Sequence, residues 1–143
     1  MDFDLITLGA GSGGVAGSRR AAMHGARVAV VERGRVGGTC VLRGCVPKKL
    51  MMYAGQYGPA LADAARFGWS TADASFDMAR WQAAKRAELE RLERIYIGML
   101  DGAGVTLLRG EACIEAPGRV RVGEQVYGYR KLLVATGGRP NTL

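Results

Sequence analysis

Two cysteines, Cys40 and Cys45, stand five residues apart in the glycine-rich stretch GGTCVLRGCVPKK at 37–49. In a regular helix, residues at this spacing are separated by about 7.5 Å along the axis. A disulfide requires Cα atoms that are roughly 4.4–6.8 Å apart, so the pair cannot be bridged inside an ideal helix. Gly44 allows a distorted turn between the cysteines, and Pro47 is tolerated only in the first turn of a helix. We therefore expect a helix to begin just after Cys45.

Cys45 would then lie at a helix N-terminus, close to Lys48 and Lys49. Such surroundings lower the pKa of a thiol from about 8.5 to roughly 3.5–7.5, and a stabilised thiolate is the reactive species in disulfide exchange. A zinc site would need more Cys and His ligands than Cys113 and His24 supply, so we predict no metal. Two unconnected buried thiols are the alternative to a redox pair.

The first thirty residues have the pattern of a βαβ unit. A short apolar run at 3–8 indicates a buried strand, the glycine-rich turn 9–14 follows at once, and 15–25 has the pattern of a helix. A second buried strand is predicted over 27–31. Such a unit implies a parallel sheet with a right-handed crossover.

The turn in this unit carries the spacing G-x-G-x-x-G at Gly9, Gly11 and Gly14, and Glu32 closes the second strand. The first glycine permits the tight turn, the second lets the backbone approach a pyrophosphate, and the third lets helix and strand pack closely. The helix N-terminus attracts phosphates, and the carboxylate can hold ribose hydroxyls. A dinucleotide site is predicted, although the pattern alone does not separate FAD from NAD. Glu32 disfavours a dinucleotide with a 2′-phosphate on its ribose, because the two negative groups would repel one another. The adjacent Arg33 slightly weakens this argument. A glycine-rich turn without a ligand is the alternative.

The rest of the chain divides into a helical part and a strand-rich part. A glycine-rich loop and three helices are predicted over 33–39, 46–53, 59–66 and 77–100. Gly102 and Gly104 end the long helix in the way that C-terminal glycines do. Beyond them, short strands are predicted over 105–108, 112–115, 119–122, 125–129 and 132–135.

Composition limits the class of protein. A chain of 143 residues forms one domain at most. Its net charge of +7 is scattered, with no interleaved basic and aromatic patch, so a pocket for anionic ligands is favoured over a nucleic-acid partner. The N-terminus lacks the features of a signal peptide and no apolar run approaches membrane-spanning length. We expect a cytoplasmic protein without a membrane partner.

Three segments resemble a known family, the pyridine nucleotide-disulfide oxidoreductases. The stretch 37–49 is similar to the family's redox-active segment, and the turn 9–14 and the run LVATGG at 133–138 are similar to its FAD domain. The resemblance covers the whole chain and implies an α/β fold. It would be a Rossmann-like FAD-binding domain, a parallel sheet with helices plus a small antiparallel β-meander, which is incomplete in residues 1–143.

Within the family, the run VPKK at 46–49 resembles the glutathione reductases, whereas dihydrolipoamide dehydrogenases and mercuric reductases usually carry Pro-Ser-Lys there. Trypanothione reductases and the large thioredoxin reductases are close neighbours. The resemblance implies that electrons pass from NADPH to FAD, then to the Cys40–Cys45 disulfide and on to glutathione disulfide. Cys40 would attack the substrate, Cys45 would face the flavin, and Lys48 would lie near the reactive edge of the flavin ring.

The resemblance also implies the residues that surround these ligands. Those that would contact FAD are Gly9, Gly11, Ser12, Gly13, Gly14, Glu32, Arg33, Gly38, Thr39, Lys48, Ala112, Thr136 and Gly137. Arg19 and Tyr96 would bind glutathione, although a solvated helix charge and a core aromatic residue are their alternatives. One departure is the apolar segment at 97–99, where family members often carry polar residues.

Family members are about three times longer, so we expect this chain to be a fragment that lacks the NADPH-binding and dimerisation domains. The full-length enzyme would be a homodimer, and the fragment alone would be inactive. The alternative is a stand-alone module that binds FAD or another dinucleotide. A plain NAD-binding domain is disfavoured, because nicotinamide binding needs no pair such as Cys40 and Cys45.

Overall fold

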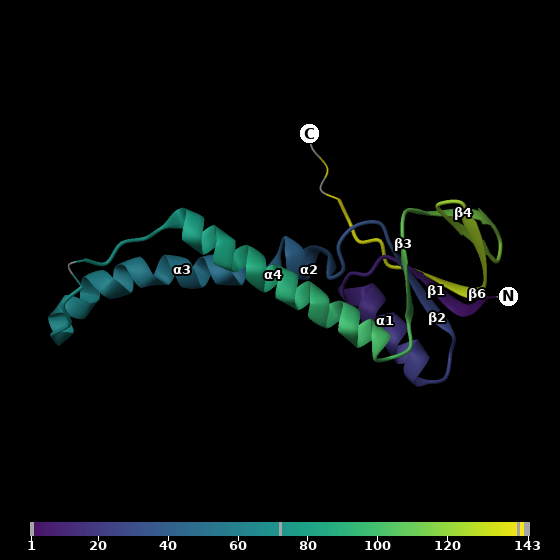
Figure 1. The fold of residues 1–143 in the computed structure, drawn as a ribbon, viewed down its shortest axis with the longest axis horizontal. Helices are drawn as coiled ribbons and strands as arrows, with labels where there is room; N and C mark the ends of the chain where they lie inside the picture. Colours follow the sequence, from purple (N-terminus) through teal and green to yellow (C-terminus); the bar gives the residue numbers. More distant parts are fainter. Residues whose placement is uncertain (1, 72, 140, 142–143) are drawn as a thin grey trace.

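The structure, a computed structural model, describes residues 2–71, 73–139 and 141. It combines one six-stranded sheet with four α-helices and a 3₁₀ turn (Figure 1). In chain order the elements are β1 (Phe3–Leu8), α1 (Ser12–Met23), β2 (Val28–Glu32), α2 (Gly38–Leu42), α3 (Cys45–Ala64), η1 (Ala65–Phe67), α4 (Met78–Asp101), β3 (Thr106–Arg109), β4 (Ala112–Ala116), β5 (Arg119–Val122) and β6 (Gln125–Val134).

The sheet has the strand order β3-β2-β1-β6-β5-β4. The strands β3, β2, β1 and β6 pair in parallel. The strands β6, β5 and β4 form an antiparallel meander, so β6 belongs to both parts of the sheet. The predicted βαβ unit is β1-α1-β2, and the predicted α/β class with a small β-meander is confirmed. Because β1 lies between β2 and β6, the residues that follow these three parallel strands meet at one edge of the sheet.

The last strand differs from the prediction, which divided it into 125–129 and 132–135. It is one strand of ten residues, β6, that changes its pairing near Tyr129. Its first part pairs with β5 in antiparallel register, and its second part pairs with β1 in parallel register. Arg130 and Lys131 interrupt the apolar pattern but not the strand, because Tyr129 and Lys131, on either side of Arg130, both pair with β1.

Alternating side chains of β1 and β2 build a core on each face of the sheet. Ile6, Leu8, Ala29 and Val31 pack against residues of the meander, whereas Val28 and Val30 belong to the core beneath α1 and α4. On that second face the hydroxyl of Ser18 in α1 donates to the hydroxyl of Thr7 in β1 over 2.8 Å, and both residues are fully buried. This bond fixes α1 against β1 directly behind the glycine-rich turn.

Two helix predictions were wrong. Residues 38–42, expected in part as a loop, form the short helix α2, and the helices expected over 46–53 and 59–66 are one helix, α3, which contains Pro59. Proline usually clashes with the Cβ atom of the preceding residue and with the carbonyl four residues before it. Here the preceding residue is Gly58, which has no Cβ atom, and Pro59 is exposed, so the helix continues.

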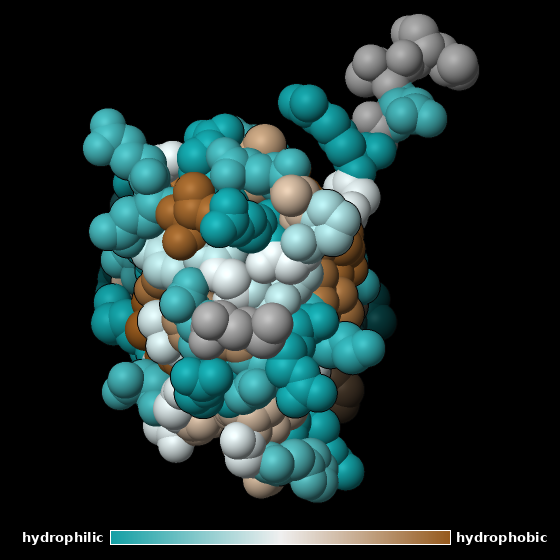
Figure 2. All heavy atoms as spheres, turned by 90° about the vertical axis from the view of Figure 1, so that its right-hand side faces the viewer, coloured by the Kyte–Doolittle hydropathy of each residue, from teal (hydrophilic) through white to brown (hydrophobic). Residues whose placement is uncertain are grey.

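The second half of α3 and the first half of α4 form an arm that extends away from the sheet (Figure 1). Between the two helices lies an apolar groove of about 1080 Å³. Large apolar side chains are exposed on α3, such as Tyr57, and in the connection between the helices, such as Phe67, Trp69 and Phe76. The opposite end of the molecule shows mostly hydrophilic residues (Figure 2). Among the described residues, the helices are too short or too polar to cross a bilayer.

Candidate disulfide and dinucleotide site

Three glycine-rich or small-residue segments converge at the edge of the sheet where β1, β2 and β6 end. A Cβ atom on Gly9 would come within 2.5 Å of the Ala135 carbonyl oxygen, and one on Gly14 within 1.8 Å of the Gly9 carbonyl oxygen. A Cβ atom on Gly38 would lie 2.6 Å from the Cα atom of Gly11. Only glycine fits at these positions, so the sequence pattern reflects backbone segments in direct contact.

The N-terminus of α1 points into this region without a side-chain cap. Gly11 is the N-cap residue and forms no side-chain hydrogen bond, and the first turn holds no acidic residue. Ser12 and Gly13 are exposed, and a Cβ atom on Gly13 would meet nothing within 4 Å. Free N–H groups with the positive end of the helix dipole, next to open space, suit a pyrophosphate group.

Glu32 lies at the end of β2, half-buried, as the fingerprint predicts. Its carboxylate accepts hydrogen bonds of 2.8 Å from the backbone N–H groups of Ala10 and Gly34. One side chain thus joins the loop after β1 to the loop after β2. A carboxylate held in this way is available to ribose hydroxyls through its remaining lone pairs.

Arg33 and Ala112 lie at the β3–β4 side of this region. The Arg33 guanidinium forms an exposed ion pair of 3.1 Å with Glu111, and Ala112 begins β4 and packs against the core of the meander face. Thr136 and Gly137 follow β6 and are exposed. The Ala135 N–H donates to the Leu8 carbonyl oxygen over 2.9 Å, which holds this segment beside the first glycine loop.

The two cysteines belong to different helices. Cys40 is half-buried in α2, and Cys45 is the exposed first residue of α3, with Gly44 as its N-cap residue. The predicted start of the helix is thereby confirmed. The break at Gly44, with φ of −126° and ψ of −106°, removes the geometric obstacle of a continuous helix.

Cys45 influences the ionisation of Cys40. The pKa of Cys40 lies above its ordinary value, chiefly because of the side-chain hydrogen bond with Cys45, with burial and the Cys45 charge adding to the effect. The backbone of Cys45 and the charge of Lys48 act in the opposite direction. Lys49 instead places its ammonium group over the ring of Tyr53, 4.8 Å from the centroid. Lys48 is therefore the lysine whose charge acts on Cys40.

Thr39 lies in α2 beside Gly38, so the contact of Gly38 with Gly11 joins the cysteine-bearing helix to the dinucleotide fingerprint. The sequence predicted the two motifs separately, and the contact in the structure shows that they lie next to one another. In the described part of the chain, no group of three or more His, Cys, Asp or Glu side chains is arranged to hold a metal ion.

The two residues expected to bind glutathione come from helices that pack together, α1 and α4. Arg19 is half-buried, with Nη1 3.6 Å from the sulfur of Met99, and its buried Nε has no hydrogen-bond partner among the described residues. Tyr96 is half-buried against the core between the sheet and these helices.

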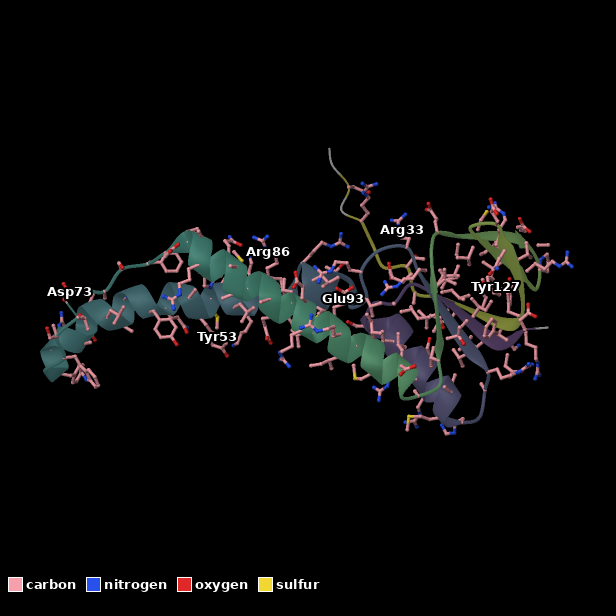
Figure 3. All side chains as sticks on the ribbon, in the orientation of Figure 1. Arg33, Tyr53, Asp73, Arg86, Glu93 and Tyr127 are labelled. Atoms are coloured by element: carbon pink, nitrogen blue, oxygen red, sulfur yellow. The ribbon has the colours of Figure 1, made fainter. Side chains whose placement is uncertain are left out.

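Glu93 of α4 was not predicted as a site residue. It lies on α4 (Figure 3), and it contacts the loop that precedes Cys40 through Arg35 and Val36. Its position is separated from that loop by 57 residues in the sequence, so no local pattern indicated the contact.

Residues 3–143 match the family of pyridine nucleotide-disulphide oxidoreductases. The chain belongs to this family. It is 52% identical over 139 residues to a glutathione reductase of Burkholderia cepacia, which covers 97% of this chain and 31% of that protein. A glutathione reductase of Nostoc sp. is 45% identical over 98% of this chain and 30% of its own length. A chloroplastic/mitochondrial glutathione reductase of Pisum sativum is 44% identical over 97% of this chain and 27% of its own length. The chain therefore spans about a third of the length of these relatives.

Proposed function

We propose that residues 1–143 form the FAD-binding, disulfide-carrying part of an NADPH-dependent glutathione-disulfide reductase. The observation that carries this proposal is the backbone contact between Gly11 and Gly38, which brings the helix that contains Cys40 against the turn of the dinucleotide fingerprint. The names of the relatives support glutathione disulfide as the substrate. Under this proposal, the NADPH-binding and dimerisation domains lie outside these residues, and the complete enzyme is a cytoplasmic homodimer.

The residues around the site fit FAD. Gly11, Ser12 and Gly13 would receive the pyrophosphate, and Glu32 would hold a ribose. Thr39, Lys48 and Thr136 would line the remaining part, at the edge where α2 and the segment after β6 meet the glycine loop. When bound, FAD would supply the electron pair, taken from NADPH, that reduces the Cys40–Cys45 disulfide to two thiols.

The chain's own cysteines can then carry out the exchange with the substrate. The Cys40 thiolate would attack one sulfur of glutathione disulfide, release one glutathione as a thiolate and form a mixed disulfide. The Cys45 thiolate would next attack the Cys40 sulfur and release the second glutathione. The two electrons of the dithiol thereby pass to glutathione, and the protein disulfide is restored. Arg19 and Tyr96 would bind the glutathione part of the substrate.

The first test is the visible absorption spectrum of the purified chain with added FAD, before and after two-electron reduction. We expect a bound flavin and, on reduction of the parent chain, a long-wavelength band. Cys40→Ser, in which the Cys45 thiol is free without reduction, should show this band with oxidised FAD, and Cys45→Ser should lack it under both conditions. A protein that takes up no FAD would refute FAD binding by residues 1–143. A band that is insensitive to Cys45→Ser would refute the role of that cysteine.

The second test identifies the attacking thiol. Because Cys113 is exposed and free, both variants are prepared in a Cys113→Ser background. After reduction and addition of glutathione disulfide, Cys45→Ser should retain one glutathione in a mixed disulfide, detected by mass spectrometry. The matched Cys40→Ser variant should retain much less, and equal retention by both would refute the assignment of Cys40.

A further inference from the structure

Glu93 of α4 joins that helix to the loop that precedes Cys40. Its Oε2 atom accepts a hydrogen bond of 2.7 Å from Nε of Arg35, and its Oε1 atom accepts one of 3.0 Å from the backbone N–H of Val36. The Glu93 side chain is only 16% exposed, so solvent competes weakly with these bonds. Both carboxylate oxygens thus accept hydrogen bonds from two consecutive residues of one loop.

The loop is held from several elements at once. The N–H of Gly34 donates to Glu32, and the N–H of Gly37 donates to the Ala10 carbonyl oxygen, each over 2.8 Å. The side chain of Val36 is fully buried in the core beneath α1 and α4. Glu93 adds the contact from α4, and Cys40 follows four residues after Val36.

We propose that Glu93 is a positioning residue for the Cys40–Cys45 pair. By fixing residues 35 and 36 it sets the start of α2, and with it the place of the Cys40 thiol next to Cys45. The proposal rests on the redox role given to this pair above. A loosened loop would reduce the fraction of time in which the thiols lie close enough to join, so it would favour the dithiol over the disulfide.

The test measures the equilibrium between the two cysteines and dithiothreitol in the purified chain, again in the Cys113→Ser background. Formation of the protein disulfide removes two electrons and two protons from the thiols, and oxidised dithiothreitol takes them up and becomes reduced. Samples equilibrated at several ratios of reduced to oxidised dithiothreitol are alkylated and analysed by mass spectrometry.

Glu93→Gln keeps an acceptor for the Val36 N–H but loses the charge that pairs with Arg35. We expect it to shift the equilibrium towards the dithiol by about fivefold, in keeping with the modest net worth of one charge-assisted hydrogen bond. Arg35→Gln should shift the equilibrium in the same direction. The shift in the double variant should be smaller than the two single shifts combined, because both substitutions remove the same interaction.

Glu88→Gln is the matched control. Glu88 lies on the same helix, five residues before Glu93, and its ion pair of 2.8 Å is with Arg91 of that helix rather than with the loop. The equilibrium should therefore not change. A lower melting temperature in Glu93→Gln with an unchanged equilibrium would overturn the proposal, because the role would then be structural only. If circular dichroism shows that Glu93→Gln does not fold, Arg35→Gln decides in the same way.

These outcomes are distinct from failure of the proposed function. A parent chain that forms no Cys40–Cys45 disulfide at any ratio would overturn the redox role and this proposal together. A parent chain that forms the disulfide, with variants that do not differ from it, would overturn only the role of Glu93.

Discussion

Gly38 lies so close to Gly11 that a Cβ atom on Gly38 would be 2.6 Å from the Gly11 Cα atom. This contact joins the turn of the dinucleotide fingerprint to the helix that carries Cys40. The backbone conformation at Gly38 also favours glycine, since its φ is +63°. The chemistry proposed for the two motifs depends on this contact, because either motif alone provides only a ligand loop or a pair of thiols.

Gly38→Ala should weaken both the fold and the cofactor site. The left-handed conformation costs a residue with a Cβ atom about 1–2 kcal/mol, and the new atom must also displace the backbone of Gly11. We expect FAD affinity to fall by about tenfold, which corresponds to about 1.4 kcal/mol. Flavin fluorescence titration and urea denaturation measure the two effects.

Gly55→Ala is the control for that substitution. Gly55 lies within α3, and a Cβ atom there would meet nothing within 4 Å. The change should stabilise the helix by about 0.5–1 kcal/mol and leave FAD binding unchanged. Equal FAD affinities in Gly38→Ala and Gly55→Ala would mean that the contact with Gly11 does not shape the site.

Ser18→Ala should destabilise the chain by about 1–3 kcal/mol, because a buried hydroxyl is left without a partner. The partner is Thr7, whose hydroxyl accepts the 2.8 Å bond from Ser18 behind the glycine-rich turn. Thr7→Val should have a similar effect, and the double variant should cost less than the two single changes added together. Urea denaturation of the four proteins measures this coupling, and strict additivity would argue against the bond.

Cys45→Ala should make Cys40 more reactive at neutral pH. The hydrogen bond with Cys45 raises the pKa of Cys40 and therefore reduces the fraction present as thiolate. Without that thiol, the pKa of Cys40 should fall towards its ordinary value, and its alkylation at a pH below that value should become faster. The rate of reaction with iodoacetamide as a function of pH, in the Cys113→Ser background, measures this. An unchanged midpoint of the profile would contradict this effect of Cys45.

Asp4 should contribute stability that is lost in acid. Its pKa is lowered from 3.8, chiefly by the hydrogen bond from the backbone N–H of Arg27. Since the folded state has the lower pKa, the contribution is complete above the unfolded value and disappears as the pH falls through the folded value. The difference in unfolding free energy between the parent and Asp4→Asn should therefore be constant above about pH 5 and shrink below it. A difference that stays constant in acid would refute this origin.

Local patterns sufficed to predict most single elements. The βαβ unit, the long helix α4 after Asp77 and the start of α3 at Cys45 follow from periodicity, from capping residues and from the limits on proline. The same patterns failed where the extent of an element depends on its contact with a distant segment. The continuity of β6 depends on its pairing with β1, and apolar alternation within the segment itself does not show that pairing.

The sequence by itself determined which residues are able to do chemistry here: the two cysteines, the glycines of the fingerprint and Glu32. Their types and spacing are local properties, and each has a local physical reason. The tertiary structure alone decided that Gly38 rests on Gly11 and that Glu93 holds the loop before Cys40. Those contacts join residues that are 27 and 57 positions apart. They arise because parallel strands bring their ends to one edge of the sheet and α4 packs beside them, which no pattern within a single segment specifies.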